Sequence, residues 1–231
     1  MFEPEVINMI VKGIGETLLM TVLSTILGYV FGLPLGVVLA VTDKGGLRPN
    51  AFVYKILDTI SNIVRSIPFL ILLILLIPFT RFIVGKSYGT MATVVPLVVA
   101  AIPFIGRMVE SSIKEVDGGV IEAAKSMGAG NFQIITRVLL VEARTSILVG
   151  ATIAIGTILG YSAMAGTVGG GGLGDIAIRY GYYRYQTDRN ESECLANEFY
   201  EIYKIYGNGK SLFSIWHRLL IIWNTFYHQL V

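Results

Sequence analysis

The sequence has few charged residues and almost none of the residues that build metal or redox sites. Only 15% of its 231 residues are charged, whereas a soluble domain of this size carries about a quarter. A single cysteine, Cys194, excludes an intrachain disulfide framework and offers no metal cluster. The net charge of +2 and the lack of a Lys or Arg stripe exclude nucleic acid as a partner. Lipid is therefore the expected solvent for much of the chain.

Motifs of catalysis and nucleotide binding are also missing. The sequence has no Gly-x4-Gly-Lys-Ser/Thr P-loop, no paired histidines for a metal, and no Ser or Cys nucleophile with a base in context. The run from Gly169 to Gly174 formally satisfies Gly-x-Gly-x-x-Gly, but it follows an apolar helical segment instead of a strand, so we exclude a dinucleotide site. We expect no enzyme activity and no cofactor in this chain, and a flexible turn at the glycine run.

Long apolar segments are what the sequence does contain. Hydrophobic residues make up 54% of the chain, and nearly uncharged stretches of about 18 residues or more predict transmembrane helices. We expect spans over residues 14–41, 52–78, 88–109 and 146–166. Pro68 lies inside the second span and should kink it, because proline removes a helical hydrogen bond. The predicted fold class is an all-α, polytopic transmembrane helical bundle with four clear spans.

Basic residues near the span ends favour an N-terminus outside the cell, since short cytoplasmic loops hold more Lys and Arg than external ones. In that orientation the outer segments hold five basic residues, Lys12, Arg81, Lys86, Arg179 and Arg184. The inner segments hold eight, Lys44, Arg48, Lys55, Arg107, Lys114, Lys125, Arg137 and Arg144.

Small residues recur at every fourth position of the first span. Gly28, Gly32, Gly36 and Ala40 therefore share one helical face, where another helix backbone can approach closely. Ordinary packing within the bundle and a moving interface between subunits both fit this stripe. The sequence does not separate the two interpretations.

Arg65 is the candidate ionisable residue at membrane depth, where such residues are costly and indicate function by default. It either lies in the membrane or extends its charge to the interface, and both positions stay open. The aromatic and Met residues near Met164 fit packing better than ligand contact. The candidate pathway or gating residues are Arg65, Pro68, Met164, Gly169 and Gly172.

The charged, amphipathic stretch between the third and fourth spans, residues 111–143, is predicted to form a helix, a turn and a second helix. Gly128 or Gly130 can adopt the positive φ of a helix C-cap, and Asn131 can cap the next helix. Such a short helix presents a defined surface, although a plain solvated loop also fits the pattern when it is taken alone.

Residues 122–128, Glu-Ala-Ala-Lys-Ser-Met-Gly, resemble the EAA motif of ABC importer permeases. That motif continues after nine residues with Ile-any-Leu-Pro, and here Val138 and Leu140 stand at the first and third of these positions. Val141 departs from the proline. The resemblance implies that this loop docks on an ATPase. The ATPase-coupling residues that it implies are Glu122, Ala123, Ala124, Lys125 and Gly128.

Further segments are similar to the methionine permeases within that family, and the similarity covers about residues 1–188. They are Arg65-Ser66-Ile67-Pro68-Phe69, Ile77-Pro78-Phe79-Thr80-Arg81, Ile83-Val84-Gly85, Pro103-Phe104, Arg107-Met108-Val109-Glu110 and Gly160-Tyr161-Ser162-Ala163-Met164.

This resemblance implies a permease subunit of the bacterial cytoplasmic (inner) membrane that moves methionine, in the L form and also the D form, by alternating access. The implied partners are a second copy of the permease, a dimer of ATPase subunits that carries the ATP and Mg, an external substrate-binding lipoprotein, and membrane lipid. The alternatives are a permease for another small amino acid or polar metabolite, and a non-transporting remnant of such a permease.

The similarity ends at Asp188, and residues 189–231 form an atypical tail. Five charges lie in residues 189–201, where the family has its fifth span. We hypothesise that a frameshift or similar lesion produced this tail. Residues 211–231 are predicted to form an amphipathic helix that lies on the membrane surface in preference to spanning it.

Overall fold

The computed structural model describes residues 4–183, and the regular elements in that range are all helices. Residues Asn8–Ile176 form one compact unit. The second unit contributes residues 4–7 and a π-helical segment, η3 (Ala177–Tyr183), to the described range. The predicted tail, residues 189–231, and its surface helix lie outside the described residues.

Three uninterrupted helical stretches are long and apolar enough to cross a membrane. They are residues Ile7–Thr42 of α1 (Pro4–Thr42), the whole of α5 (Thr90–Lys114), and Arg144–Val168, which comprises α9 (Arg144–Ala165) and the 3₁₀ turn η2 (Gly166–Val168). The all-α fold and the first, third and fourth predicted spans are confirmed.

The second predicted span is broken instead of kinked. Helices α2 (Ala51–Ser66) and α3 (Phe69–Leu75) meet at 103°. Between them Ile67 is extended, with φ −81° and ψ 124°, because the ring of a following proline disfavours helical backbone at the residue before it. Pro68 thus ends one helix and begins another, so the pair forms either a sharply broken span or a re-entrant segment.

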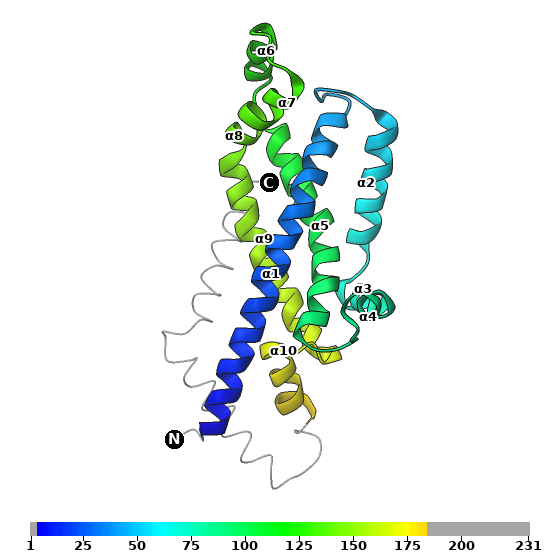
Figure 1. The fold of residues 1–231 in the computed structure, drawn as a ribbon, viewed down its shortest axis with the longest axis vertical. Coiled ribbons are helices and arrows are strands. Elements are labelled where there is room, and N and C mark those ends of the chain that lie inside the picture. The colour runs from blue at the N-terminus through cyan, green and yellow to red at the C-terminus, as the bar shows by residue number, and fades with distance from the viewer. Residues whose placement is uncertain (1–3, 184–231) are drawn as a thin grey trace. The chain divides into compact units, whose positions relative to one another are not determined.

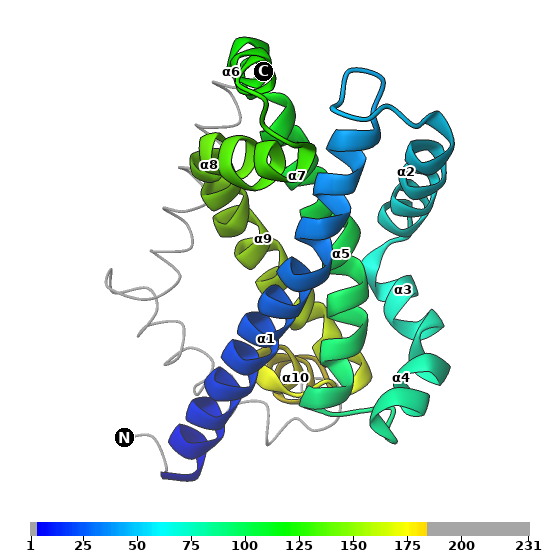
Figure 2. The same ribbon diagram turned by 45° about the horizontal axis from the view of Figure 1, so that its top comes forward.

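A short helix occupies most of the segment between the second and third predicted spans. Helix α4 (Ile77–Val84) contains Arg81, and Gly85 ends it with φ +75°. Lys86 follows in the turn that leads to α5. Figures 1 and 2 show α2, α3 and α4 following one side of α5.

Helix α5 forms the centre of the compact unit, and the small-residue stripe of α1 packs against it. A Cβ atom added at Gly32 would lie 3.0 Å from the Ile105 Cβ and from the Ile102 carbonyl oxygen. Gly28 faces Ala101 in the same way. Of the two interpretations left open, the structure supports close helix packing within one chain.

The glycine run is tied to two helices by its backbone. The Gly172 N–H donates to the Glu16 Oε2 over 2.8 Å, and the Leu173 N–H donates to the Thr17 Oγ1 over 2.9 Å. The Gly169 carbonyl accepts from the Gly89 N–H over 3.0 Å. Short helix α10 (Gly172–Ile176) begins within the run. The expected flexible turn is therefore a hydrogen-bonded one, because α1 supplies acceptors that the local sequence does not show.

Replacing Glu16 by alanine should lower the free energy of unfolding by about 1–3 kcal/mol, because the Gly172 N–H loses its charged acceptor. Lys12→Ala is the matched control. Its ammonium lies 4.0 Å from Glu16 and the side chain is 79% exposed, so this change should have little effect. Thermal unfolding in detergent measures both. Equal losses in the two variants would contradict the role given to Glu16.

Candidate functional site

The connection between α5 and α9 forms a projecting structure at one end of the compact unit (Figure 1). It contains α6 (Gly118–Ser126), then α7 (Asn131–Gln133), the π-helical η1 (Ile134–Leu139) and α8 (Leu140–Glu142). The loop starts later than the predicted residue 111, because helix α5 continues to Lys114. Residues 115–143 form the loop itself, which we call the coupling loop. The predicted order of helix, turn and helix is confirmed.

Capping interactions fix both ends of α6. At its start the Asp117 carboxylate accepts a hydrogen bond from the Gly119 N–H over 2.6 Å. At its end the Gly128 N–H donates to the Lys125 carbonyl over 2.9 Å, and the Ala129 N–H donates to the Ala124 carbonyl over 3.1 Å. This pair of bonds is the Schellman motif, which needs a left-handed residue just after the helix. The spacing from Glu-Ala-Ala to Gly therefore sets where α6 stops.

Gly128 is the glycine that adopts this conformation, with φ +78°. Gly130, the other candidate, has φ −71° and acts as the N-cap of the next helix. The expectation that Asn131 caps that helix is wrong, because Asn131 is already its first helical residue. The Gly130 N–H instead donates to the Gln133 side chain over 3.1 Å, which is how a residue three positions into a helix can satisfy the cap.

The two alanines of the motif have different environments. Ala124 is 4% exposed and belongs to the apolar cluster that includes Ile134 and Leu139 of η1. Glu122, Ala123 and Lys125 are exposed. Ala124 therefore holds α6 against the second half of the loop, while its neighbours form an outward surface.

Ala124→Leu should destabilise the coupling loop by about 1–3 kcal/mol, because added methylene groups overpack a filled contact. Ala123→Leu adds the same volume to an exposed position and should leave the loop fold unchanged. Amide hydrogen exchange over residues 115–143 in detergent distinguishes the two variants. Faster exchange in both variants, or in neither, would contradict this assignment.

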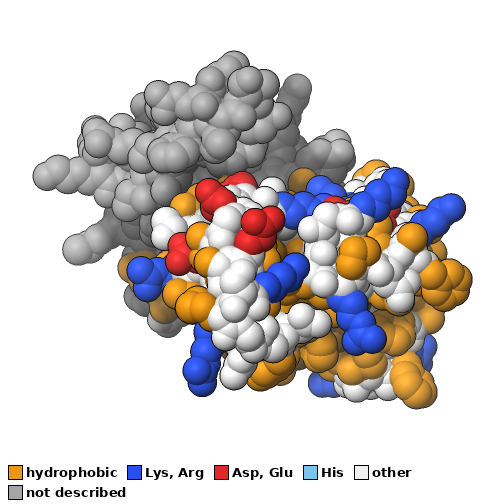
Figure 3. All heavy atoms as spheres, turned by 90° about the horizontal axis from the view of Figure 1, so that it is seen from above, with side chains coloured by type: hydrophobic (Ala, Val, Ile, Leu, Met, Phe, Trp, Pro, Cys, Tyr) orange, Lys and Arg blue, Asp and Glu red, His pale blue; other side chains and the backbone are white. Residues whose placement is uncertain are grey.

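Large apolar side chains accompany the charges on this surface. Met127 is 81% exposed and Phe132 is 77% exposed. Figure 3 looks onto this end of the molecule and shows Lys, Arg, Asp and Glu side chains beside apolar patches. Exposed apolar side chains with a charged rim are typical of a protein-binding surface.

A chain of hydrogen bonds closes the base of the coupling loop. The Ser112 hydroxyl of α5 donates to the Ser146 Oγ of α9 over 2.9 Å. Ser146 in turn donates to the Glu115 carboxylate over 3.1 Å. The loop therefore starts and ends on two helices that are joined directly, so a displacement of the loop acts on both.

The same end of the unit holds a network of charges that the sequence did not reveal. Its centre is Glu110 of α5, which is only 3% exposed. The Glu110 carboxylate accepts from the Arg107 Nη1 and the Lys114 Nζ, each over 2.7 Å, and from the Tyr54 hydroxyl of α2 over 3.2 Å. A buried carboxylate is expected to be paired in this way.

The network extends from α5 to two other segments. Arg107 forms an ion pair with Asp58 of α2, and its Nη2 donates to the Asn62 Oδ1 over 3.0 Å. Lys114 forms an ion pair of 2.8 Å with Asp43, which follows α1. We call Asp43, Asp58, Arg107, Glu110 and Lys114 the charge network.

The Asp43 carboxylate lies outside the apolar spans, and its hydrogen bond to Lys114 holds its pKa below the ordinary value of 3.8. Because the pKa is lowered in the folded protein, the ion pair contributes its full stability above that ordinary value. The contribution is lost as the pH falls through the lower, folded pKa. The pair is therefore charged at neutral pH.

The predicted pathway residues lie on different elements and do not form one site. Arg65 is an exposed residue in the last turn of α2, and Pro68 is the N-cap of α3. Met164 of α9 is 50% exposed in the single chain, and Gly169 and Gly172 lie in the hydrogen-bonded glycine run. Near Met164, Tyr161 stacks on Phe69 with ring centroids 4.5 Å apart, which agrees with the packing role expected for the aromatic residues there.

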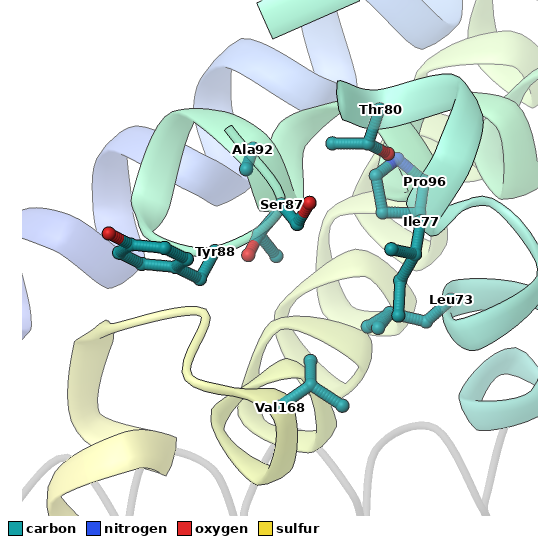
Figure 4. Close-up of a pocket in the computed structure, with 9 residues that line it drawn as sticks. Leu73, Ile77, Thr80, Ser87, Tyr88, Ala92, Pro96 and Val168 are labelled. Carbon is teal, nitrogen blue, oxygen red and sulfur yellow. The ribbon is translucent and has the colours of Figure 1, made fainter. Parts of the chain in front are cut away.

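A shallow hollow lies beside the glycine run, and none of the predicted pathway residues lines it. Its lining comes from α3, α4, the turn before α5, α5 itself and η2 (Figure 4). These residues are Leu73, Ile77, Thr80, Ser87, Tyr88, Ala92, Thr93, Pro96 and Val168. The lining offers hydroxyl groups but no charged side chain, so it cannot form ion pairs with the ammonium and carboxylate groups of a free amino acid.

The helical membrane unit and the coupling loop define the class of this protein. The model of the family described as "Binding-protein-dependent transport system inner membrane component" matches residues 32–188. The chain belongs to this family of membrane-embedded transport components.

Its relatives narrow the class further. The chain is 54% identical over 149 residues to the probable D-methionine transport system permease protein MetI of Vibrio cholerae, an alignment that covers 64% of this chain and 66%, just under two thirds, of the relative. It is 51% identical over 158 residues to the D-methionine transport system permease protein MetI of Escherichia coli K12, with 68% and 73% covered.

A solved structure shares the fold. It is described as showing inward facing conformations of the MetNI methionine ABC transporter, and it superposes with a TM-score of 0.78 at 46% identity, covering 90% of this chain and 96% of the other. The architecture described above is thus that of an ABC transporter permease.

Proposed function

We propose that this chain is the membrane-spanning permease subunit of an ATP-driven importer of methionine. The observation that carries the proposal is the coupling loop, in which a capped helix presents Glu122, Ala123 and Lys125 outward while Ala124 anchors it. The methionine substrate is supported by relatives at about half identity whose names specify methionine transport.

The assembly that goes with this function contains a second copy of the chain and two ATPase subunits docked on the coupling loops. ATP and Mg bind to the ATPase subunits. An external substrate-binding lipoprotein delivers the ligand, and lipid surrounds the apolar helices. In this arrangement the coupling loop faces the cytoplasm and the N-terminus lies outside, as the basic residues around the loop favour.

The ATPase-coupling residues are Glu122, Ala123, Ala124, Lys125 and Gly128. Closure of the ATPase dimer displaces the two coupling loops. The hydrogen bonds that join Ser112, Ser146 and Glu115 pass that displacement to α5 and α9. The pathway then opens outward to receive the ligand. Arg65, Pro68, Met164, Gly169 and Gly172 are the residues that we propose for the pathway or its gate.

Uptake of labelled methionine into liposomes tests the proposal. The liposomes contain this chain, its ATPase and its binding protein, and unlabelled amino acids compete one at a time. We expect ATP-dependent uptake that unlabelled L-methionine or D-methionine suppresses. Suppression by a different amino acid instead would identify another substrate, and an assembled complex without uptake would identify a non-transporting remnant.

A further inference from the structure

Helix α2 contacts α5 through polar side chains. Among its residues only Ser61 is buried, whereas Phe52, Ile56, Ile60 and Ile63 are exposed large apolar residues. The side of α2 that contacts α5 carries several polar residues. Tyr54, Asp58 and Asn62 follow one another at intervals of four and so share one helical face.

The polar face of α2 therefore meets the polar end of α5. Asp58 and Asn62 both contact Arg107, while Tyr54 contacts Glu110. The Lys114 ammonium also lies 5.5 Å from the centre of the Tyr54 ring, within the range of a cation–π contact. These contacts hold α2 to α5 where apolar packing is sparse.

The charge network lies at the base of the coupling loop. Lys114 is the last residue of α5, and the loop begins at the next residue. Lys114 also binds Asp43 in the connection between α1 and α2. The network thus joins the base of the loop to α2 and to the end of α1.

The buried Glu110 carboxylate makes the ion pairs between α5 and its neighbouring segments costly to break. Glu110 is nearly inaccessible and holds two cations, Arg107 and Lys114, that each bind a second carboxylate on another segment. Separating α2 from α5 takes Asp58 away from Arg107 and the Tyr54 hydroxyl away from the buried Glu110 carboxylate. Breaking partly buried polar contacts in this way is unfavourable, because the groups left behind lose hydrogen-bond partners. We therefore expect α2, the end of α1 and α5 to move together without breaking these ion pairs.

We propose that Asp43, Asp58, Arg107, Glu110 and Lys114 are positioning residues that join α2 and the end of α1 to α5 as one moving body. This inference rests on the proposed function, because the motion that it transmits starts at the coupling loop. Through the charge network, displacement of the loop reaches the broken helix pair α2–α3 as well as α5 and α9.

Spin-label distances test the proposed rigid body directly in the full complex. Labels are placed on Phe52→Cys of α2 and Ser111→Cys of α5, both exposed positions, with Cys194→Ser removing the native thiol. Excess unlabelled chain restricts the signal to pairs within one copy. We expect the same distance in the nucleotide-free and ATP-bound complexes. A distance that changes with nucleotide would overturn the proposal.

Uptake per ATP hydrolysed provides a second test. Asp58→Asn removes the charge that binds Arg107, and we expect this ratio to fall by about fivefold or more while ATP hydrolysis continues. Lys55→Gln is the matched control because it removes an exposed charge from the same helix, and it should keep the wild-type ratio. An assembled Asp58→Asn complex with the wild-type ratio would overturn the proposal.

The two proposals fail in different ways. Lack of methionine uptake by the wild-type complex contradicts the proposed function. The spin-label measurement still decides the rigid-body inference in that case, because it requires only an assembled complex that binds ATP.

Discussion

Replacing Gly128 by valine should lower ATP-driven methionine uptake about tenfold or more in an assembled complex. Gly128 has φ +78°, and a left-handed conformation costs an ordinary L residue about 1–2 kcal/mol, with β-branched residues the least suited. Relaxing that strain breaks the Schellman bonds of Gly128 and Ala129. The end of α6 then unwinds, and the outward surface loses its shape. Liposome uptake measures the effect.

Gly130→Val is the control for this prediction. Gly130 is two residues away, but its φ of −71° and ψ of 155° suit a β-branched residue. A Cβ atom at either glycine would meet open space in this chain, so the two variants differ in backbone conformation and not in crowding. Comparable losses in both would show that the loop surface, and not the left-handed turn, is what the substitutions disturb.

Gly36→Ala should lower the free energy of unfolding by about 3 kcal/mol, the upper part of the range for overpacked cores. The new Cβ would meet the Gly106 carbonyl oxygen and lie 2.7 Å from the Val109 Cβ. Both belong to α5, so α1 and α5 have to separate. Chemical unfolding in detergent, followed by loss of helical signal, measures the change.

Gly15→Ala is the matched control for this second substitution. It lies in the same helix, and an added Cβ meets nothing within 4 Å. Because glycine is a weaker helix former than alanine, Gly15→Ala should raise stability by about 0.5–1 kcal/mol. A loss at Gly15 equal to that at Gly36 would contradict the close packing of α1 on α5.

Local sequence features predicted much of this fold. Segment length and lack of charge located α1, α5 and α9, because in lipid a helix satisfies its own backbone hydrogen bonds. Proline explains the break between α2 and α3, but we expected too small an effect. The restriction that Pro68 places on Ile67 turns the chain through a right angle or more, and a count of apolar residues does not show this.

The candidate site was predictable only where its contacts are local. The end of α6 depends on residues within five positions, so either glycine could be proposed from the sequence. Arg107 and Asp58 are 49 residues apart, and Gly172 and Glu16 are 156 apart. Such partners become evident only from the packing of the helices. The charge network left signals in the sequence only within single helices. They are the spacing of Tyr54, Asp58 and Asn62 in α2 and that of Arg107, Glu110 and Lys114 in α5.

Active transport of methionine through an ATPase-coupled loop is tested most directly by the methionine concentration inside liposomes that contain the full complex. This concentration is followed over time with and without ATP. We predict accumulation above the external concentration with ATP, and its loss when Gly128→Val replaces the wild-type chain. Equal internal concentrations with and without ATP, in a complex that hydrolyses ATP, would show that this chain does not couple ATP hydrolysis to methionine transport.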